Sequence, residues 1–389
     1  MTTLPMERET PFDPPGKLLD LAARAPIHRM TYTDGHLGWL VTGHALGRAV
    51  LAHPDFTSSP KDLHPPVPGR EKVFGGGSDF LTPPGFFIRM DPPEHTRFRK
   101  LLTGQFTVRR MQRLEPRITE ITEQVLDAMR PPADLVEDFA LPIPSLVICE
   151  LLGVPYEDRD SFQDDTRVIV NLESEAEEIF AAGGRLQAYF ADLVARKRAE
   201  PDDALISGLL ELDDEDLVGV ALLLLVAGHE TTANMLGLGT YALLTNPDQL
   251  AVMRERPSVV DGAVEELLRY LSIIHLGPFR VATADVSIGG QTIKKGDSVT
   301  ISTSAANFDP ARFPDPARLD LTRQATGHLS FGHGIHQCLG QQLARIEMRI
   351  AFPALLRRFP ELRLACDPAE VPMRSHMSIY GVHRLPVTW

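Results

Sequence analysis

The stretch that decides the fold of this chain reads Phe331-Gly332-His333-Gly334-Ile335-His336-Gln337-Cys338-Leu339-Gly340. Its first two glycines allow a tight turn with positive φ, and Gly340 leaves room for a flat group to approach the backbone. After the loop, apolar residues recur at helical spacing, at Leu343, Ala344, Ile346 and Ile350. The aligned N–H groups at a helix start lower the pKa of a thiol, and cysteine binds iron as the thiolate. We therefore expect Cys338 to lie directly in front of a helix, where its thiol is more readily ionised.

Two other interpretations of this loop are weaker. His333, His336 and Cys338 could serve a zinc ion, but a closed zinc site needs four donors, usually in paired spacings. The other cysteines, Cys149 and Cys366, form no Cys-x-x-Cys pair. Cys149 lies in an apolar run and is expected to be a buried small hydrophobe. No local pattern matches the signature of a cysteine protease.

Composition indicates a protein with a sizeable core and a reducing environment. The chain has 389 residues, of which 43% are hydrophobic and 23% charged, and its formal net charge is −13. This charge argues against general binding to nucleic acid, and three cysteines without paired spacing argue against a disulfide framework. The polar segment 1–17 lacks the apolar centre of a signal peptide, and the longest apolar run, 221–227, is too short to span a bilayer. We expect a cytoplasmic protein without a membrane anchor.

The pattern along the chain predicts one mainly α domain with small β-sheets over residues 1–389. A hairpin is expected over 27–41 around a two-residue Asp34-Gly35 turn, followed by a helix over 44–52. Prolines and scattered aromatics in 57–87 indicate a long lid or binding loop. Helices dominate from 94 to 274, and short strands follow in 282–302. A helix after Cys338 and short strands near Leu362 and Ile379 complete the prediction.

The longest predicted helix, 214–244, contains the run Ala227-Gly228-His229-Glu230-Thr231-Thr232. Glycine and threonine are poor choices inside a helix, and threonine hydroxyls can bond back to the preceding turn and bend the axis. The run therefore predicts a functional break in the middle of the helix. His229-Glu230 is not a zinc protease motif, because the second histidine of His-Glu-x-x-His is replaced by Ala233.

The loop 331–340 resembles the haem-binding signature of the cytochrome P450 family, Phe-Gly-x-Gly-x-His-x-Cys-x-Gly, at every fixed position. The run 227–232 is similar to the oxygen-binding segment of the same family. The resemblance implies the P450 fold, with haem b between the long central helix and the helix that follows the cysteine loop. It makes Cys338 the axial thiolate and implies that Thr231 and Glu230 deliver protons. Further contacts with haem are implied for Phe331, Gly332, Gly340, Ala227 and Gly228, with room for dioxygen at Gly228.

Three more segments resemble the family. Glu266 and Arg269 match its Glu-x-x-Arg pair, which is buried and joined by a later arginine, here expected at Arg318. The segment Asp91-Pro92-Pro93-Glu94-His95-Thr96-Arg97-Phe98-Arg99 matches one common in bacterial members. His95 and Arg99 share a helix face, and a guanidinium can bind a carboxylate through two hydrogen bonds. The resemblance therefore assigns the haem propionates to His95, Arg99, Arg280 and His336.

The resemblance implies a bacterial monooxygenase that hydroxylates or epoxidises a bulky hydrophobic molecule. The substrate expected first is a secondary metabolite such as a macrolide, another polyketide or a terpenoid. A foreign compound is the second choice. By family position, the pocket draws on the 57–88 loop, the 168–180 region, Val226, Ala227, His275, Leu276, Ser378 and Ile379. Such a mostly apolar pocket suits a hydrophobic ligand held by few polar groups, with His275 as an orienting donor.

The chain carries no flavin or nicotinamide domain, so electrons from NAD(P)H are expected through a ferredoxin and its reductase. We expect a basic docking patch on the thiolate side, formed by Lys100, Arg109, Arg110, Arg113, Arg345 and Arg349. Two other classes stay open. A peroxide-driven haem enzyme would not need the Glu230–Thr231 pair, and a non-enzymatic haem sensor would need neither that pair nor a long lid loop.

Overall fold

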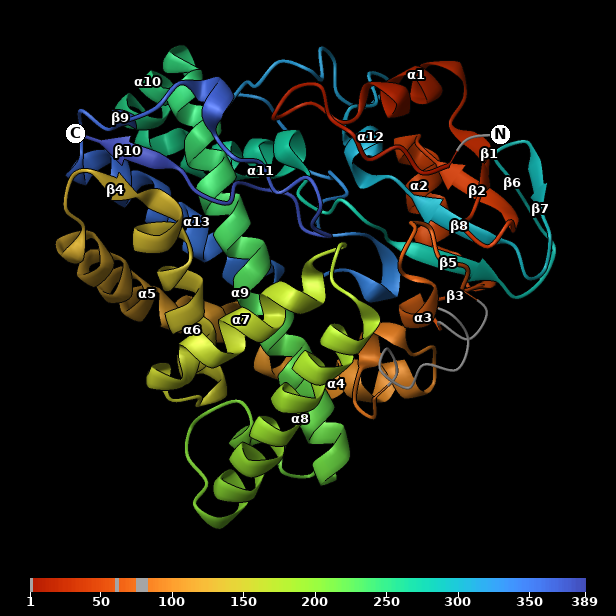
Figure 1. Cartoon of the computed structure of the whole chain (residues 1–389), viewed down its shortest axis with the longest axis horizontal. Helices are drawn as coiled ribbons and strands as arrows, with labels where there is room; N and C mark the ends of the chain where they lie inside the picture. The colour runs from red at the N-terminus through yellow and green to blue at the C-terminus, as the bar shows by residue number, and fades with distance from the viewer. Residues whose placement is uncertain (1–2, 60–62, 75–82) are drawn as a thin grey trace.

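The computed structural model describes residues 3–59, 63–74 and 83–389. Helices account for most of this part of the chain. Most strands gather at one end of the molecule, and a smaller group lies at the opposite end, near the C-terminus (Figure 1). The α-helices are α1 Gly16–Arg24, α2 His44–Ala52, α3 Glu71–Phe74, α4 Glu94–Gln105, α5 Val108–Ala128, α6 Pro142–Leu152, α7 Arg159–Val170, α8 Ala176–Ala199, α9 Asp214–Thr245, α10 Pro247–Glu255, α11 Val260–Leu271, α12 Thr303–Asn307 and α13 Gln341–Arg358.

The strands form small sheets. The largest has the order β1-β2-β8-β5-β3, with β2 and β8 parallel and the other pairs antiparallel. A second sheet has the order β4-β10-β9, and β6 pairs with β7. The strands are β1 Ile27–Thr31, β2 Leu37–Val41, β3 Phe56–Thr57, β4 Ala133–Asp134, β5 Phe279–Ala282, β6 Val286–Ile288, β7 Gln291–Ile293, β8 Ser298–Ile301, β9 Arg363–Leu364 and β10 Pro386–Thr388.

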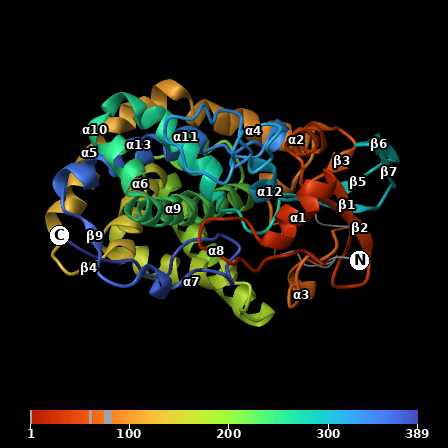
Figure 2. The same ribbon diagram turned by 90° about the horizontal axis from the view of Figure 1, so that it is seen from above.

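Helix α9 runs through the middle of the helical part (Figures 1 and 2). The Asp213 side chain caps its start by accepting a hydrogen bond from the Asp216 N–H. The helix packs on α6, α8 and α13, and Gly239 allows close approach to α13, because a Cβ there would lie 2.6 Å from the Phe352 ring. By length and composition α9 could cross a membrane, but 67% of its apolar window is buried inside the protein. Packing against other helices explains its apolar character.

The structure corrects three local predictions. Helix α9 continues through 227–232 without interruption, so the predicted break is wrong. The hairpin is present, but its connection spans 32–36 and is longer than a two-residue turn, with Gly35 at φ +88°. Near the C-terminus, Ile379 forms only an isolated bridge with Ile274, and the last strand is β10. The helix and strand content otherwise agrees with the prediction of a mainly α protein with small sheets.

Candidate functional site

The cysteine loop holds the shape that its glycines predict. Gly332 and Gly334 have φ values of +67° and +76°, and the Cys338 N–H donates to the Phe331 carbonyl at 2.9 Å. Helix α13 begins at Gln341, and the backbone N–H groups of Gly340 and Gln341 point to the Cys338 sulfur. The Cys338 side chain is exposed, and a Cβ added at Gly340 would meet no atom within 4 Å. The loop therefore presents its sulfur toward open space, next to a backbone that a flat group can approach.

Opposing effects act on the pKa of the Cys338 thiol. The sulfur borders open space, but the protein atoms around it desolvate the thiol and raise the pKa of Cys338 in the protein alone. The N–H groups of Gly340 and Gln341 lower this pKa, as the helix start predicts, and the charges of Arg99 and Arg345 act in the same direction. Desolvation is the largest effect, so the net shift is upward. A positive ion at the sulfur would favour the thiolate.

Basic side chains gather beside the loop. Arg99 of α4 donates to the Gln337 carbonyl at 2.6 Å, which ties α4 to the cysteine loop. The His95 and His336 rings lie 4.2 Å apart. Burial, followed by the charges of Arg280, His95, Arg99 and Arg89, lowers the pKa of His336 to about 3. We call this set the cationic cluster: Arg89, His95, Arg99, Arg280 and His336.

Within the described part of the chain, no carboxylate forms an ion pair with Arg89, Arg99 or Arg280. Burial lowers the pKa of Arg89 and of Arg280 to about 10, and only Asp91 offsets the effect at Arg280. The Nε2 atoms of His95 and His336 are buried without a hydrogen-bond partner. Buried donors and charges without partners are costly. The cluster fits the two carboxylates of a haem, and Arg89 is a member that sequence reasoning missed although it precedes the Asp91 motif by two residues.

The middle of α9 also has an accessible face. Ala227 is exposed, and Val226, Gly228 and Thr231 are partly exposed, although the helix on both sides is buried. The Thr231 hydroxyl donates to the Ala227 carbonyl at 2.9 Å. A Cβ at Gly228 would lie 2.7 Å from Cδ1 of Ile148 in α6, so Gly228 has a packing reason of its own. Ala227 is the most accessible residue at this point of the helix, and the Thr231 hydroxyl lies beside its carbonyl.

Glu230 is buried and paired, not solvated. It is 3% exposed, and its carboxylate accepts a hydrogen bond from Arg374 at 3.0 Å. The Asn234 side chain donates to the Glu230 carbonyl oxygen at 2.7 Å and to its carboxylate at 3.3 Å. The neighbouring His229 lies 3.2 Å from the Thr166 hydroxyl of α7 through its Nε2 atom. Sequence reasoning missed Arg374, which is distant in the chain and carries no local signal.

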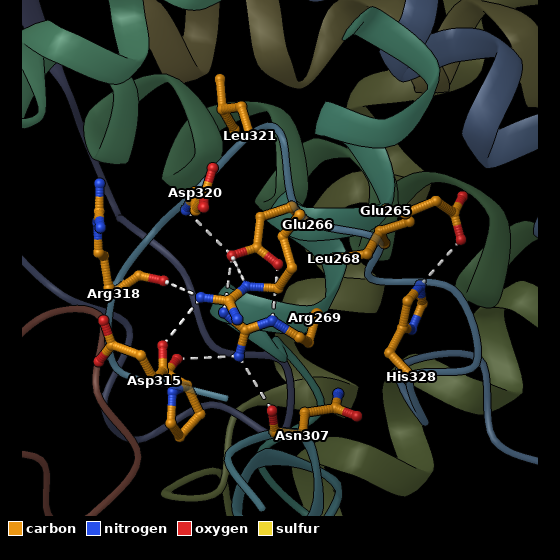
Figure 3. A network of polar contacts seen from close by, with 12 residues as sticks. Glu265, Glu266, Leu268, Arg269, Asn307, Asp315, Arg318, Asp320, Leu321 and His328 are labelled. Atoms are coloured by element: carbon orange, nitrogen blue, oxygen red, sulfur yellow. Dashed lines mark hydrogen bonds and ion pairs between the residues drawn. The ribbon is translucent and has the colours of Figure 1, made fainter. Parts of the chain in front are cut away.

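The buried Glu266–Arg269 pair is present (Figure 3). Its third member is Arg323 and not Arg318. Arg269 donates to both carboxylate oxygens of Glu266 at 2.7 and 2.8 Å, and both side chains are fully buried. Arg323 reaches the same carboxylate at 3.1 Å. Arg318 contributes only its backbone carbonyl, which accepts from Arg323 at 3.1 Å. Asp315 has φ +50°, and its carbonyl accepts a hydrogen bond from Arg323 at 2.9 Å.

A second ion-pair network supports the cysteine loop. Glu265 accepts from Arg345 at 2.6 and 3.0 Å and lies 3.2 Å from His328 Nε2. Arg345 also lies over the Phe331 ring at 4.5 Å. Burial alone would raise the pKa of Glu265, but hydrogen bonds from His328 and Arg345 lower it to about 2. Glu265 thus connects α11, α13 and the loop.

Two side chains of the predicted basic patch already form ion pairs with carboxylates. Arg345 pairs with Glu265, and Arg349 pairs with Asp261 at 2.9 Å. Three other arginines share one surface pocket of about 670 Å³ with Asp202 and Asp203. Gly104 of α4 also lines this pocket. It is five residues beyond Arg99, which corresponds to about 7.5 Å along the helix axis. The arginines that gather there are Arg109, Arg110 and Arg113.

The expected substrate-lining segments meet near the C-terminal end of α11. His275 N–H donates to the Ser378 carbonyl at 3.0 Å, and Ile274 bridges to Ile379. The His275 Nε2 atom lies 2.9 Å from the Met6 carbonyl, so this nitrogen is already engaged within the chain. In the 57–88 loop, residues 60–62 and 75–82 lie outside the described residues.

Comparison with known proteins agrees with this geometry. The cytochrome P450 family model matches residues 187–381. Cytochrome P450 105C1 from a Streptomyces species is 49% identical over 393 residues, covering 98% of this chain and 97% of that protein. The crystal structure of CYP105P1 in complex with filipin I has a TM-score of 0.94 and 47% identity, covering 100% of this chain and 98% of that chain. The mycinamicin VIII methyl hydroxylase MycCI from Micromonospora griseorubida, bound to mycinamicin VIII, has a TM-score of 0.92 and 37% identity, with both chains fully covered. This chain therefore belongs to the cytochrome P450 family of haem-thiolate monooxygenases.

Proposed function

We propose that the whole chain works as one haem-dependent monooxygenase unit in the cytoplasm, with Cys338 as the axial thiolate. The cationic cluster carries this proposal, because its orphaned imidazole nitrogens and unbalanced guanidinium groups lie beside the loop that presents the sulfur. Haem, when bound, supplies the dioxygen and one-electron chemistry. The protein orients it through Cys338 and the cluster, and Phe331, Gly332 and Gly340 form the adjoining surface.

The decisive test is the spectrum of the reduced protein with carbon monoxide. A thiolate ligand produces a strongly red-shifted Soret band. We expect this band in the wild type and its loss in Cys338→Ser, while Cys149→Ser, which changes a buried cysteine of α6, keeps it. A red-shifted band that survives Cys338→Ser would rule out the assignment of the ligand.

We assign proton delivery to Glu230 and Thr231. The Ala227 carbonyl holds the Thr231 hydroxyl at the accessible face of α9. Glu230 begins from a buried ion pair with Arg374, so its carboxylate must leave that partner before it can pass a proton toward Thr231. Positioned acids and hydroxyls of this kind contribute about 10²–10⁴-fold to a rate. Thr231→Ala should therefore consume electrons with little product, whereas Thr232→Ala, one residue further along α9, should not.

The proposed substrate is a bulky hydrophobic secondary metabolite that is hydroxylated or epoxidised. The relatives that bind filipin I and mycinamicin VIII support this choice, as do the apolar side chains of Val226, Leu276 and Ile379. A panel of macrolides, terpenoids and foreign aromatic compounds can be ranked by the spectral shift that substrate binding causes. Binding of small aromatics alone would favour the second candidate, oxidation of foreign compounds.

Members of the family generally need redox partners, and we propose a ferredoxin with its reductase, fed by NAD(P)H. Three arginines at one pocket offer a basic contact for an acidic protein. Arg113→Glu should slow reduction by ferredoxin at low salt and have little effect at high salt. The matched control is Arg196→Glu on α8, where the arginine pairs with Asp192. Turnover with hydrogen peroxide but none with ferredoxin and reductase would instead favour the peroxide-driven alternative.

A further inference from the structure

The segment before α1 crosses the C-terminal part of the chain and lies beside it in both views (Figures 1 and 2). We call residues 4–15 the N-terminal strap. The Tyr380 hydroxyl donates to the Pro11 carbonyl at 3.0 Å, and Phe12 packs against Tyr241 and Tyr270. The Met6 carbonyl lies 2.9 Å from His275 Nε2. The strap is therefore fixed against the segments expected to line the substrate pocket.

Arg8 of the strap points inward. Its guanidinium lies over the Tyr380 ring at 3.9 Å, and its Nη1 atom donates to the Asp13 and Phe12 carbonyls at 3.2 and 3.5 Å. The Nε and Nη2 atoms are buried without a partner. Burial is the main cause that lowers the pKa of Arg8 to about 10. Within the described residues, no carboxylate forms an ion pair with this guanidinium.

The His275 ring lies close to Arg8. It meets the Tyr380 ring edge-on at 5.4 Å, and backbone hydrogen bonds with Met6 and Met377 hold it in place. The same tyrosine ring therefore touches both Arg8 and His275. Burial and then the charge of Arg8 lower the pKa of His275 to about 4, so the ring is neutral near pH 7.

This arrangement is costly as it stands. A buried cation is stabilised by a paired anion or by a full set of hydrogen bonds, and here two guanidinium donors have neither. The tyrosine face compensates only in part, because a cation–π contact contributes about 0.5–2 kcal/mol. A carboxylate supplied by a ligand would accept both free Arg8 donors in the parallel geometry that arginine prefers.

We propose that Arg8 binds the carboxylate of the substrate, so that the preferred substrates are hydrophobic acids. The juxtaposition of Arg8 and His275 at the Tyr380 ring carries this proposal. Tyr380 follows Ile379, which pairs with Ile274, so an acid bound at Arg8 would lie next to the segments expected to line the substrate pocket. The proposal rests on the monooxygenase function and names the chemical class of its substrate.

The test compares dodecanoate with dodecanamide, which has the same apolar chain but no charge. Equilibrium dialysis with the haem-loaded protein gives both dissociation constants directly. We expect the wild type to bind the acid about tenfold more tightly than the amide, as a hydrogen-bonded charge pair should. Arg8→Gln should remove this preference, and Arg8→Lys should retain part of it. The control is Arg24→Gln, which changes an exposed arginine in the last turn of α1 and should leave the preference intact.

Three results would overturn the proposal. These are failure of the wild type to bind dodecanoate, equal binding of acid and amide, and an acid preference that survives Arg8→Gln. The first two need no variant, so they decide the matter even if Arg8→Gln does not fold. The reduced carbon monoxide spectrum of the same samples separates this proposal from the proposed function. A red-shifted band without acid preference rejects only the role of Arg8, whereas loss of the band in the wild type rejects haem-thiolate chemistry.

Discussion

Arg323→Ala should destabilise the protein far more than Arg318→Ala. The Arg323 side chain is 12% exposed, and it donates to Glu266 at 3.1 Å and to the carbonyls of Asp315 and Arg318 at 2.9 and 3.1 Å. Hydrogen bonds to charged groups contribute about 1.5–3 kcal/mol each. Glu266 keeps Arg269 in the variant, so the expected loss is about 3 kcal/mol and not the full cost of an unpaired buried charge.

Urea unfolding of the haem-loaded protein measures this difference, with the haem content of each sample determined beforehand. Arg318 is exposed and its side chain points away from the network (Figure 3). Arg318→Ala should therefore change the free energy of unfolding by less than about 0.5 kcal/mol. Arg323→Lys should recover part of the loss, because an ammonium can reach Glu266 but cannot serve the carbonyls in the same geometry. Equal losses for Arg318→Ala and Arg323→Ala would refute the assignment of the third arginine.

Three further perturbations test other buried charges. The pKa of Glu265 is lowered from 4.5 to about 2, so the ionised carboxylate stabilises the fold above pH 4.5. This contribution of about 3 kcal/mol disappears as the pH falls to 2. Acid unfolding of Glu265→Gln should therefore lack this loss of stability. Burial raises the pKa of Glu347 from 4.5 to about 8, so the fold should lose about 5 kcal/mol as the pH rises from 4.5 to 8. Urea midpoints of Glu347→Gln that fall as steeply as those of the wild type would contradict this. Arg374→Ala leaves Glu230 buried without its cation and should cost about 3 kcal/mol of unfolding free energy, whereas Arg374→Lys should cost clearly less.

The segments with local signals could be predicted from the sequence. The turn at Gly332 and Gly334 depends on neighbouring backbone only, and α9 depends on its own long run of apolar residues. The predicted break in α9 was wrong, because tertiary packing on α6, α8 and α13 outweighs the weak propensity of glycine and threonine. Local propensity is informative only where no such packing competes.

The partners of buried charges could not be predicted in the same way. Glu230 meets Arg374 across 144 positions of sequence, and Arg8 meets Tyr380 at the opposite end of the chain. No periodicity relates such residues. The choice of Arg323 over Arg318 depends on the path of the loop, in which Asp315 has φ +50° and its carbonyl accepts from Arg323. Fold class and the turn of the cysteine loop were accessible to sequence reasoning, whereas the electrostatic network was not.

The cationic cluster has a consequence for how the protein matures. Arg89 lowers the pKa of Arg280, and the charges of Arg89, Arg99 and Arg280 converge on His336. These like charges repel one another, and a dianionic cofactor would neutralise them. The folded protein is therefore less stable without its cofactor than with it, and mass action makes the folded population depend on haem supply. Cells short of haem should accumulate protease-sensitive chains, and added haem precursor should raise the yield of intact protein without any change in its synthesis.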